Sequence, residues 1–252
     1  MAGLTLSLDG RRAVVTGGAS GIGAAIARAF ASAGATVTVA DRDQASAQSL
    51  AEEIGGTPWA VDLSDVTALE DLALDADILV NNAGVQRINP IQDFVPADWR
   101  LIHRLMLEAP FLLTRAVLPG MYDRGFGRII NVSSAHGLVA SPFKSAYVAA
   151  KHGLQGLTKV TALEGGDHGV TANCINPGYV RTPLVDKQVA DQAASRGITE
   201  DEVLGQVFLA HSAVKRLAEP EEVAALAVWL ASDVAAVANG SSYSLDGGWT
   251  AG

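Results

Sequence analysis

The sequence predicts a doubly wound α/β domain, in which helices cover both faces of a parallel sheet. Short segments rich in β-branched residues alternate with longer, alanine-rich segments along the whole 252-residue chain. This alternation is typical of parallel strands that are joined by right-handed helical crossovers. Neither an internal repeat nor a linker rich in proline, glycine or serine divides the chain. We therefore expect one domain over residues 1–252.

Seven short segments have the composition of strands. In chain order they are RAVVTGG (12–18), TVTVAD (36–41), PWAVD (58–62), DILVNNAG (77–84), GRIINVSS (127–134), GVTANCINPG (169–178) and SSYSLDGG (241–248). Longer segments at 22–33, 44–54, 98–124, 147–164 and 221–232 are predicted to be helices. Pro96 and Pro119 are expected near the two ends of the long third helix, because proline is tolerated at helix boundaries.

One region interrupts the alternation of strands and helices. Residues 181–216 are rich in polar side chains and lie between the sixth strand and the last predicted helix. Insertions at the carboxyl end of a strand are where open α/β sheets build lids over their substrates. We therefore predict a helical substrate lid at about 181–216, after the sixth strand.

Composition narrows the classes of partner and the compartment. The formal net charge of −9 argues against nucleic acid or an anionic membrane as a partner, because both would be repelled. Cys174 is the only cysteine, so no intrachain disulfide can form, and we expect it to be buried in a strand. The apolar stretch after Arg12 meets Arg28 after 15 uncharged residues, short of the ~18 that a membrane span requires. These features predict a cytoplasmic protein.

The glycine-rich turn after the first strand is a candidate phosphate-binding loop. It reads TGGASGIG over residues 16–23, and Gly17, Gly21 and Gly23 would let the backbone approach a pyrophosphate closely. The following helix would offer its free N–H groups and its positive dipole end to the phosphates. Glycines also mark ordinary turns between strands and helices, so the loop alone does not establish a nucleotide site.

Asp41 ends the second strand, 24 residues after Gly17. An acid at this distance binds the adenosine ribose hydroxyls in dinucleotide-binding folds. Its carboxylate would repel a 2′-phosphate, so the sequence predicts NAD rather than NADP as the cofactor. Arg42 leaves the opposite choice open, since an arginine can receive that phosphate, and Asp41 could instead cap the next helix.

Three further polar residues form a candidate catalytic set. Tyr147 and Lys151 are four residues apart on one predicted helix and therefore share a face. A neighbouring ammonium lowers the pKa of a phenol, which would let Tyr147 exchange a proton near neutral pH. Ser134 ends the fifth strand and can donate a hydrogen bond to a carbonyl oxygen as its negative charge grows.

Together these motifs resemble the short-chain dehydrogenase/reductase family. TGGASGIG, Asp62 in AVDLSD, NNAG at 81–84, Ser134, the Tyr147–Lys151 pair and NPGYVRTP at 176–183 follow the order and spacing of that family. The resemblance covers nearly the whole chain and implies a Rossmann-like fold. It implies that Ser134, Tyr147 and Lys151 are catalytic, with Tyr147 as general acid/base. It also implies that the cofactor contacts Gly17, Ser20, Gly21, Ile22, Gly23, Asp41, Asp62, Leu63, Asn82, Gly84, Tyr147, Lys151, Pro177, Val180 and Thr182.

A narrower resemblance concerns the substrate. SSAHGLVASPFKSAYVAAKHG at 133–153, GYVRTPLVDKQVADQA at 178–193 and the closing LDGGWTA look like the 3-hydroxybutyrate dehydrogenase branch of the family. The branch implies an interconversion of (R)-3-hydroxybutyrate and acetoacetate. It places Gln86, His136, Lys144 and Gln188 around the carboxylate and Trp249 on the apolar end, next to Ser134 and Tyr147. Taken singly, Lys144 and His136 could be ordinary loop residues.

Met106 departs from the family pattern. The family usually has an asparagine seven residues after a tryptophan such as Trp99, where it holds a water that connects the lysine to solvent. A thioether cannot donate a hydrogen bond and accepts only weakly. We therefore expect another group to relay the proton, or turnover to be slow. A cofactor-binding protein without useful catalysis is a third reading, beside a dehydrogenase acting on another hydroxy acid, a sugar alcohol or a 3-oxoacyl thioester.

Two expectations concern metals and assembly. The five histidines show no pairing at zinc-site spacing, so the sequence predicts no metal. The resemblance implies a homotetramer formed through the two long helices and the C-terminal strand region. Apolar segments such as EEVAALAVWLAS, at 221–232, permit that reading and equally permit burial in the core of one subunit.

Overall fold

A single parallel sheet forms the centre of the computed structural model, which describes residues 6–252 without the side chains at 184, 187, 191–192 and 194–196. Seven strands follow the order β3-β2-β1-β4-β5-β6-β7, and every neighbouring pair is parallel. The strands are β1 (Arg12–Thr16), β2 (Thr36–Asp41), β3 (Thr57–Ala60), β4 (Ile78–Asn81), β5 (Gly127–Val132), β6 (Val170–Pro177) and β7 (Ser242–Leu245). The predicted doubly wound, Rossmann-like sheet is thus confirmed.

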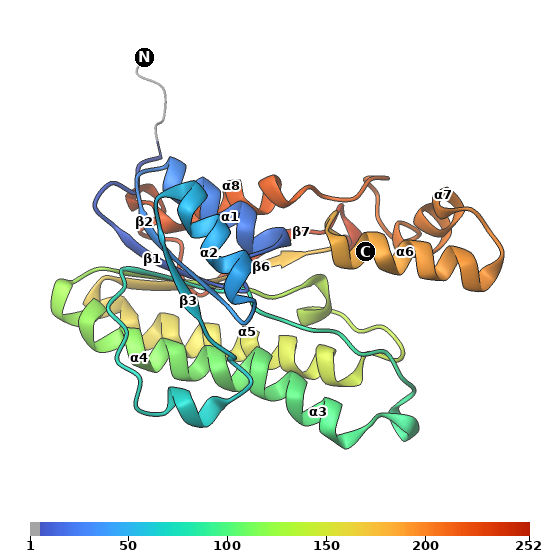
Figure 1. Cartoon of the computed structure of the whole chain (residues 1–252), viewed down its shortest axis with the longest axis horizontal. Coiled ribbons are helices and arrows are strands. Elements are labelled where there is room, and N and C mark those ends of the chain that lie inside the picture. Colours follow the sequence, from blue (N-terminus) through green and yellow to red (C-terminus); the bar gives the residue numbers. More distant parts are fainter. Residues whose placement is uncertain (1–5) are drawn as a thin grey trace, which may run out of the picture.

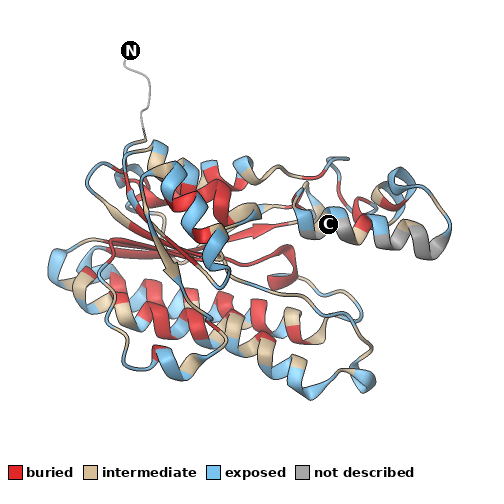
Figure 2. Cartoon of the chain, viewed as in Figure 1, coloured by how far each residue is buried: buried red, intermediate tan, exposed pale blue. Residues whose placement is uncertain are grey.

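Helices cover both faces of the sheet (Figure 1). The helices α1 (Gly21–Ser32), α2 (Gln44–Ile54) and α8 (Pro220–Ala231) share one buried apolar cluster with the strands on one face. On the other face, α4 (Ala109–Arg124) and α5 (Ser145–Gly165) pack on β4, β5 and β6, and α3 (Pro96–His103) packs against α5. In the helices that pack on the sheet, such as α1, α4 and α5, the buried residues lie on the side toward it (Figure 2).

The apolar side of α8 lies in the core of the subunit. Val223, Ala227 and Leu230 are buried in the same cluster as α1 residues. Its predicted apolar segment is therefore explained largely by packing within one chain.

Central strands are buried on both faces. All residues of β5 and β6 are buried, as expected for parallel strands that are covered by helices on both faces. Cys174 lies on β6 with no exposed surface, and its Sγ is 3.0 Å from Thr158 Oγ1, so the prediction of a buried cysteine is confirmed.

The order of the strands reverses between β1 and β4. The crossovers from β1 run outward to β3, and the chain then returns to place β4 on the other side of β1. At such a switch point the loops after the two strands diverge and leave a crevice at the carboxyl edge of the sheet. The glycine-rich turn and the residues after β4 therefore meet at the same place.

The long third helix differs from the prediction. It begins at Pro96, and residues Arg104–Glu108 form a five-residue π-helical segment between α3 and α4. Pro119 lies inside α4 rather than at its end. A helix can contain a proline at the cost of one backbone hydrogen bond when tertiary packing holds the flanking turns, and Leu113, Val117 and Met121 of α4 are fully buried.

The predicted helical segment after the sixth strand is confirmed. It contains α6 (Pro183–Arg196), α7 (Glu200–Val203) and a π-helical turn at Leu204–Phe208. Val189, Val203, Phe208, Leu209 and Leu217 form a small apolar cluster of their own. Figure 1 shows this segment extending beyond the end of β6. We call residues 181–216 the lid segment.

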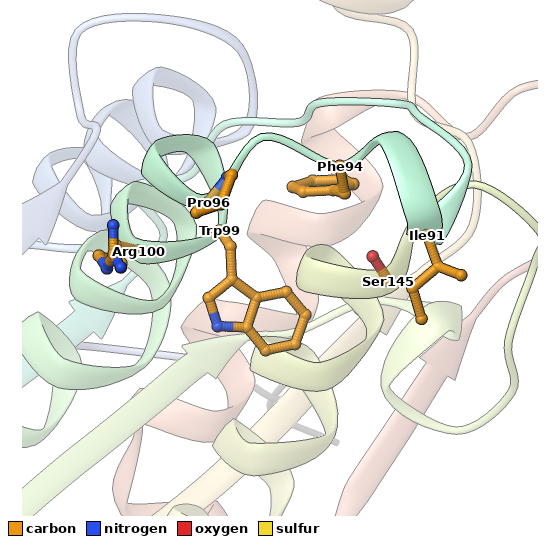
Figure 3. Close-up of a pocket in the computed structure, with 6 residues that line it drawn as sticks. All are labelled: Ile91, Phe94, Pro96, Trp99, Arg100 and Ser145. Atoms are coloured by element: carbon orange, nitrogen blue, oxygen red, sulfur yellow. The ribbon is translucent and has the colours of Figure 1, made fainter.

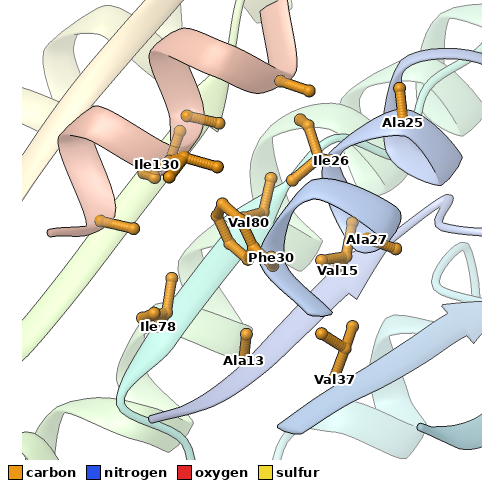
Figure 4. Packing of buried hydrophobic residues seen from close by; sticks show 14 of the residues in the cluster. Ala13, Val15, Ala25, Ile26, Ala27, Phe30, Val37, Ile78, Val80 and Ile130 are labelled. Atoms are coloured by element: carbon orange, nitrogen blue, oxygen red, sulfur yellow. The ribbon is translucent and has the colours of Figure 1, made fainter. Parts of the chain in front are cut away.

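Ile26 offers a test of the packing on the first face. It is fully buried beside Phe30, Val15 and Val80 (Figure 4). We expect Ile26→Ala to lower the free energy of unfolding by about 2–5 kcal/mol, because the cavity left behind cannot fully collapse.

Arg28 on the same helix provides the control. Its ion pair with Glu53, at 2.6 Å, joins two half-exposed side chains, so Arg28→Ala should cost about 1 kcal/mol or less. Urea unfolding measures both variants, and equal losses would contradict this account of the core.

Candidate active site

A cavity of about 610 Å³ opens at the carboxyl edge of the sheet. Of the residues that the sequence assigned to the cofactor, the substrate or catalysis, all except Gly23 line it. They are Gly17, Ser20, Gly21, Ile22, Asp41, Asp62, Leu63, Asn82, Gly84, Gln86, Ser134, His136, Lys144, Tyr147, Lys151, Pro177, Val180, Thr182, Gln188 and Trp249. The fold thus brings together residues at the carboxyl ends of all seven strands and on α5 and α6.

The glycine-rich turn is shaped for close approach of a ligand. Gly17 and Gly21 have φ angles of +59° and +51°, a left-handed conformation that favours glycine. A Cβ on Gly17 would lie 2.9 Å from Ala83 Cα, and one on Gly23 would overlap the carbonyl oxygen of Gly17. Gly23 therefore shapes the turn from behind. The side chain of Ser20 does not cap α1, so the N-terminal N–H groups of this helix remain for an anion such as a phosphate.

Asp41 is held at the edge of the cavity by two backbone donors. Ala19 N donates to Oδ2 and Asp43 N donates to Oδ1, both at 3.1 Å. Asp43, and not Asp41, caps α2 by accepting from Ser46 N. The alternative reading of Asp41 as a helix cap is therefore wrong, and its carboxylate lines the cavity.

Asp62 lies farther along the same wall. Its Oδ1 accepts hydrogen bonds from the Ser64 hydroxyl and the Ser64 N–H, at 2.7 and 2.9 Å. These bonds lower the pKa of Asp62, so the group is a carboxylate at neutral pH. It can accept a hydrogen bond from a base amino group.

Ser134, Tyr147 and Lys151 meet between β5 and α5. Lys151 is buried, and its Nζ donates to Val132 O at 2.6 Å and lies 5.6 Å from the centre of the Tyr147 ring. Hydrogen bonding joins the Tyr147 hydroxyl to Ser134. This places a phenol and a second hydroxyl where they can both bind one oxygen atom of a ligand.

The pKa of Tyr147 departs from the prediction. Burial raises the pKa of Tyr147, and the hydrogen bond from Ser134 offsets only part of this increase. Burial also lowers the pKa of Lys151 to about 8. The expectation that Lys151 lowers the pKa of the phenol is therefore wrong for the protein alone, because loss of hydration dominates. In this state Tyr147 holds its proton and can act as an acid.

The wall of the cavity next to Tyr147 combines aromatic side chains with the cation of Lys144. The rings of His136 and Trp249 are 4.9 Å apart and perpendicular, and Tyr179 stacks on Trp249 at 5.9 Å. Lys144 Nζ lies 5.6 Å from the Tyr179 ring, and burial lowers the pKa of Lys144. Lys144 and His136 are therefore part of the cavity wall and not ordinary loop residues.

Tyr179 is a residue that the sequence reasoning missed. It lies in the NPGYVRTP segment, next to Val180 and Thr182, and its ring is 4.5 Å from that of Phe208 in the lid segment. The signal that could have identified it is the presence of an aromatic residue, Tyr179, within the NPGYVRTP motif that was predicted to line the cofactor site.

A smaller cavity lies outside this site. It has a volume of about 210 Å³ and is lined by Ile91, Phe94, Pro96, Trp99, Arg100 and Ser145 near the start of α3 (Figure 3). It contains none of the residues predicted to bind or react.

Two further properties concern the described part of the chain. Over residues 6–252, His, Cys, Asp and Glu side chains form no group of three that could hold a metal ion. Among the helices described, none is both long enough and apolar enough to cross a bilayer.

The fold and the cavity define a dinucleotide-dependent oxidoreductase of the short chain dehydrogenase family. The pattern of that family matches residues 11–193, and the chain belongs to it. Members bind a nicotinamide cofactor, which the glycine turn and Asp41 fit.

Individual relatives are similar over nearly their whole length. The chain is 47% identical to D-beta-hydroxybutyrate dehydrogenase of Rhizobium meliloti, covering 96% of this chain and 99% of the relative. It is 45% identical to the enzyme of the same name from Cupriavidus necator, covering 97% and 99%. The structure resembles L-sorbose reductase of Gluconobacter frateurii complexed with NADPH and L-sorbose, with a TM-score of 0.88, 33% identity and coverage of 98% and 99%.

The buried Lys151 predicts a pH dependence of stability. Its pKa is about 8 in the folded protein and 10.5 by its ordinary value. Between these values the unfolded chain binds a proton that the folded chain does not, so the free energy of unfolding should rise with pH. Lys151→Met keeps the length of the side chain and should lack this contribution.

Urea unfolding of the cofactor-free protein at about pH 8 and about pH 10 tests this shift. The stability of the wild type should increase relative to that of Lys151→Met across the window. A constant difference between the two proteins would refute it.

Proposed function

We propose that this protein is an NAD-dependent oxidoreductase that interconverts (R)-3-hydroxybutyrate and acetoacetate. The observation that carries the proposal is Lys144, a half-buried cation set among aromatic rings in the cavity that also contains Ser134 and Tyr147. A short hydroxy acid has a carboxylate and an apolar methyl end, which match this wall. The two D-beta-hydroxybutyrate dehydrogenases that resemble the chain support the same substrate.

The catalytic roles follow from the contacts of Ser134, Tyr147 and Lys151. Ser134 and Tyr147 hydrogen-bond the reacting oxygen, and Tyr147 transfers a proton to or from it. Lys151, held by Val132 O, supplies positive charge on the cofactor side of the phenol. The nicotinamide, when bound, accepts or donates the hydride.

Substrate specificity comes from polar side chains that line the same cavity. Lys144 provides a charge for the carboxylate, and Gln86 and Gln188 donate amide hydrogens. His136 also lines this cavity and keeps its hydrogen bond to Ser141. Trp249 packs on the apolar end, and the lid segment supplies Gln188.

Asp41 supports NAD as the cofactor. Its two backbone donors hold the carboxylate in place, and a 2′-phosphate there would face a like charge. Arg42 also lines the cavity, and the similar L-sorbose reductase is complexed with NADPH. Rates with NAD⁺ and with NADP⁺ therefore test the preference for NAD.

We expect Asp41→Asn to lower kcat/KM for NAD⁺ on the order of 10–100-fold, because a hydrogen bond to a charged group contributes about 1.5–3 kcal/mol. The value for NADP⁺ should rise or stay constant, since repulsion is removed. Initial rates with both cofactors measure the ratio. A parallel loss with both would contradict the assignment of Asp41.

Lys144 tests the substrate class. Lys144→Gln should raise KM for 3-hydroxybutyrate about 10–100-fold, because the carboxylate loses a charged partner. KM for a neutral alcohol should change little, and Lys144→Arg should retain much of the binding. Lys159→Gln, a change at an exposed lysine on α5, is the matched control. An unchanged KM for the hydroxy acid in Lys144→Gln would refute the carboxylate pocket.

A sugar alcohol or its ketose is the second candidate substrate, favoured by the structural similarity to L-sorbose reductase. A cofactor-binding role with weak catalysis has less support, because Ser134, Tyr147 and Lys151 are all in place. A 3-oxoacyl thioester offers no free carboxylate to Lys144 and has less support for that reason. The Lys144 variants separate these readings by the charge of the substrate.

Assembly and location complete the proposal. We propose a homotetramer, because Phe111 on α4 and Val160 and Leu163 on α5 are exposed apolar side chains on the two long helices. Location in the cytoplasm, a single-domain organisation and the absence of nucleic-acid and membrane partners stay predictions from the sequence.

A further inference from the structure

We propose that Tyr147 exchanges its proton with solvent through Ser134, His136 and Ser141, and not along the Lys151 side of the cavity. This inference rests on the proposed function, since it concerns the proton released when an alcohol is oxidised. Two independent features of the cavity wall carry it: an apolar cluster around Met106 and a chain of polar groups that starts at Ser134, beside Tyr147.

The apolar cluster is centred on Met106, which belongs to the π-helical segment. Met106 is 2% exposed and packs with Ile102, Ala146 and Ala150. Its Cε lies 3.2 Å from the position of a Cβ on Gly84. Since a thioether does not donate a hydrogen bond, this cluster gives a proton no path from Lys151 toward α3. Within the described part of the chain, the only hydrogen-bond partner found for Lys151 Nζ is Val132 O.

The polar chain starts at the other neighbour of Tyr147. Ser134 Oγ hydrogen-bonds Tyr147 and lies 3.5 Å from His136 Nδ1. On the far side of the ring, His136 Nε2 lies 2.9 Å from Ser141 Oγ. Ser141 belongs to the loop before α5 and is partly exposed. The chain therefore reaches from the reacting hydroxyl to the protein surface.

Local structure fixes the imidazole in this chain. Ser134 Oγ accepts from His136 N at 3.1 Å, which holds the short helical turn at Ala135–Gly137. The ring is 4% exposed and packs against Trp249, with Tyr147 6.0 Å away. Its two nitrogens are thereby directed at the two serine hydroxyls.

The charge state of His136 suits a relay. Burial, with the positive charges of Lys144 and His152, lowers its pKa to about 4. The ring is therefore neutral at physiological pH, with one donor and one acceptor nitrogen. A neutral imidazole can accept a proton at one nitrogen and release another from the opposite nitrogen.

The transfer balances as follows in the direction of oxidation. The substrate hydroxyl passes its proton to the Tyr147 hydroxyl oxygen as Tyr147 passes its own proton to Ser134 Oγ, while the substrate carbon loses a hydride to the nicotinamide. In the same step Ser134 gives its proton to His136 Nδ1. His136 then releases its Nε2 proton to Ser141 Oγ, which gives a proton to water. Once the product has left, exchange with water through both serines restores the original tautomer.

The test uses His136→Gln in the full-length protein, because glutamine keeps a hydrogen-bond donor and cannot relay a proton as imidazole does. In weakly buffered solution we expect kcat for oxidation to fall by about tenfold or more. Positioned proton transfer typically contributes about 10²–10⁴-fold to a rate. The solvent deuterium isotope effect on kcat should increase, and KM for 3-hydroxybutyrate should change less than about threefold, because Lys144, Gln86 and Gln188 still hold the carboxylate.

Added imidazole should restore part of kcat in His136→Ala, which leaves space for it. Ser141→Ala should show the same pattern with a smaller loss, since water can replace one hydroxyl, and it tests the chain without changing a buried ring. His152→Gln, an exposed histidine on α5, is the matched control and should behave as the wild type.

The outcomes separate the relay from the substrate assignment. If His136→Gln raises KM while kcat, the isotope effect and the response to imidazole stay unchanged, His136 is only a carboxylate ligand and the relay is overturned. If the wild type oxidises a neutral alcohol and not 3-hydroxybutyrate, the proposed function fails. The same kcat and isotope comparisons on that alcohol then decide the relay.

Discussion

Thr16 and Asn82 form the contact on which the geometry of the cavity depends. Thr16 Oγ1 donates to Val80 O at 3.1 Å and accepts from the backbone N–H groups of Asn82 and Ala83. Asn82 Nδ2 in turn donates to the carbonyl oxygens of Thr16 and Gly17, at 2.9 and 3.1 Å. These bonds tie the end of β1 to the end of β4 where the strand order reverses. The glycine turn, the crevice and the start of α1 all take their positions from this junction.

A second junction, between β5 and α5, sets the reactive end of the cavity. Lys151 Nζ reaches back to Val132 O, and Ser133 Oγ lies 3.3 Å from Lys151 O. Burying an ammonium disfavours its charged form, and the lowered pKa of Lys151 reflects this cost. The fold tolerates the cost because the backbone carbonyl and the neighbouring side chains hold the amine close to Tyr147. The same desolvation raises the pKa of the Tyr147 phenol, so the pKa values of the two groups lie farther apart than in water.

Much of this arrangement was predictable from the sequence. The alternation of β-branched and alanine-rich segments gave the sheet, and the glycine spacing with Asp41 gave the cofactor side, since both depend on local residue types. Hydrogen bonds across the sheet were not predictable in the same way. That Asp43 rather than Asp41 caps α2 depends on the backbone direction after β2, and both acids fit the sequence rule. The sign of the Tyr147 pKa shift depends on burial, which the spacing of Tyr147 and Lys151 does not report.

Tyr179 and the π-helical segment at Arg104–Glu108 escaped prediction for a related reason. Each is defined by tertiary packing: Tyr179 by its stack on Trp249, and the π-helical segment by the cluster of Met106 with Ile102, Ala146 and Ala150. Met106 departs from the family pattern in the sequence itself. Its proposed consequence, proton exchange through Ser134, His136 and Ser141, depends on tertiary contacts that the sequence does not report.

The central claim is that one cavity holds NAD and a short hydroxy acid in reactive contact. The most direct measurement is the initial rate of NADH formation by the purified protein with each enantiomer of 3-hydroxybutyrate, with NAD⁺ and with NADP⁺. The account predicts oxidation of the (R) enantiomer with NAD⁺, and little or no reaction of the (S) enantiomer. Absence of NADH formation from both enantiomers would contradict it.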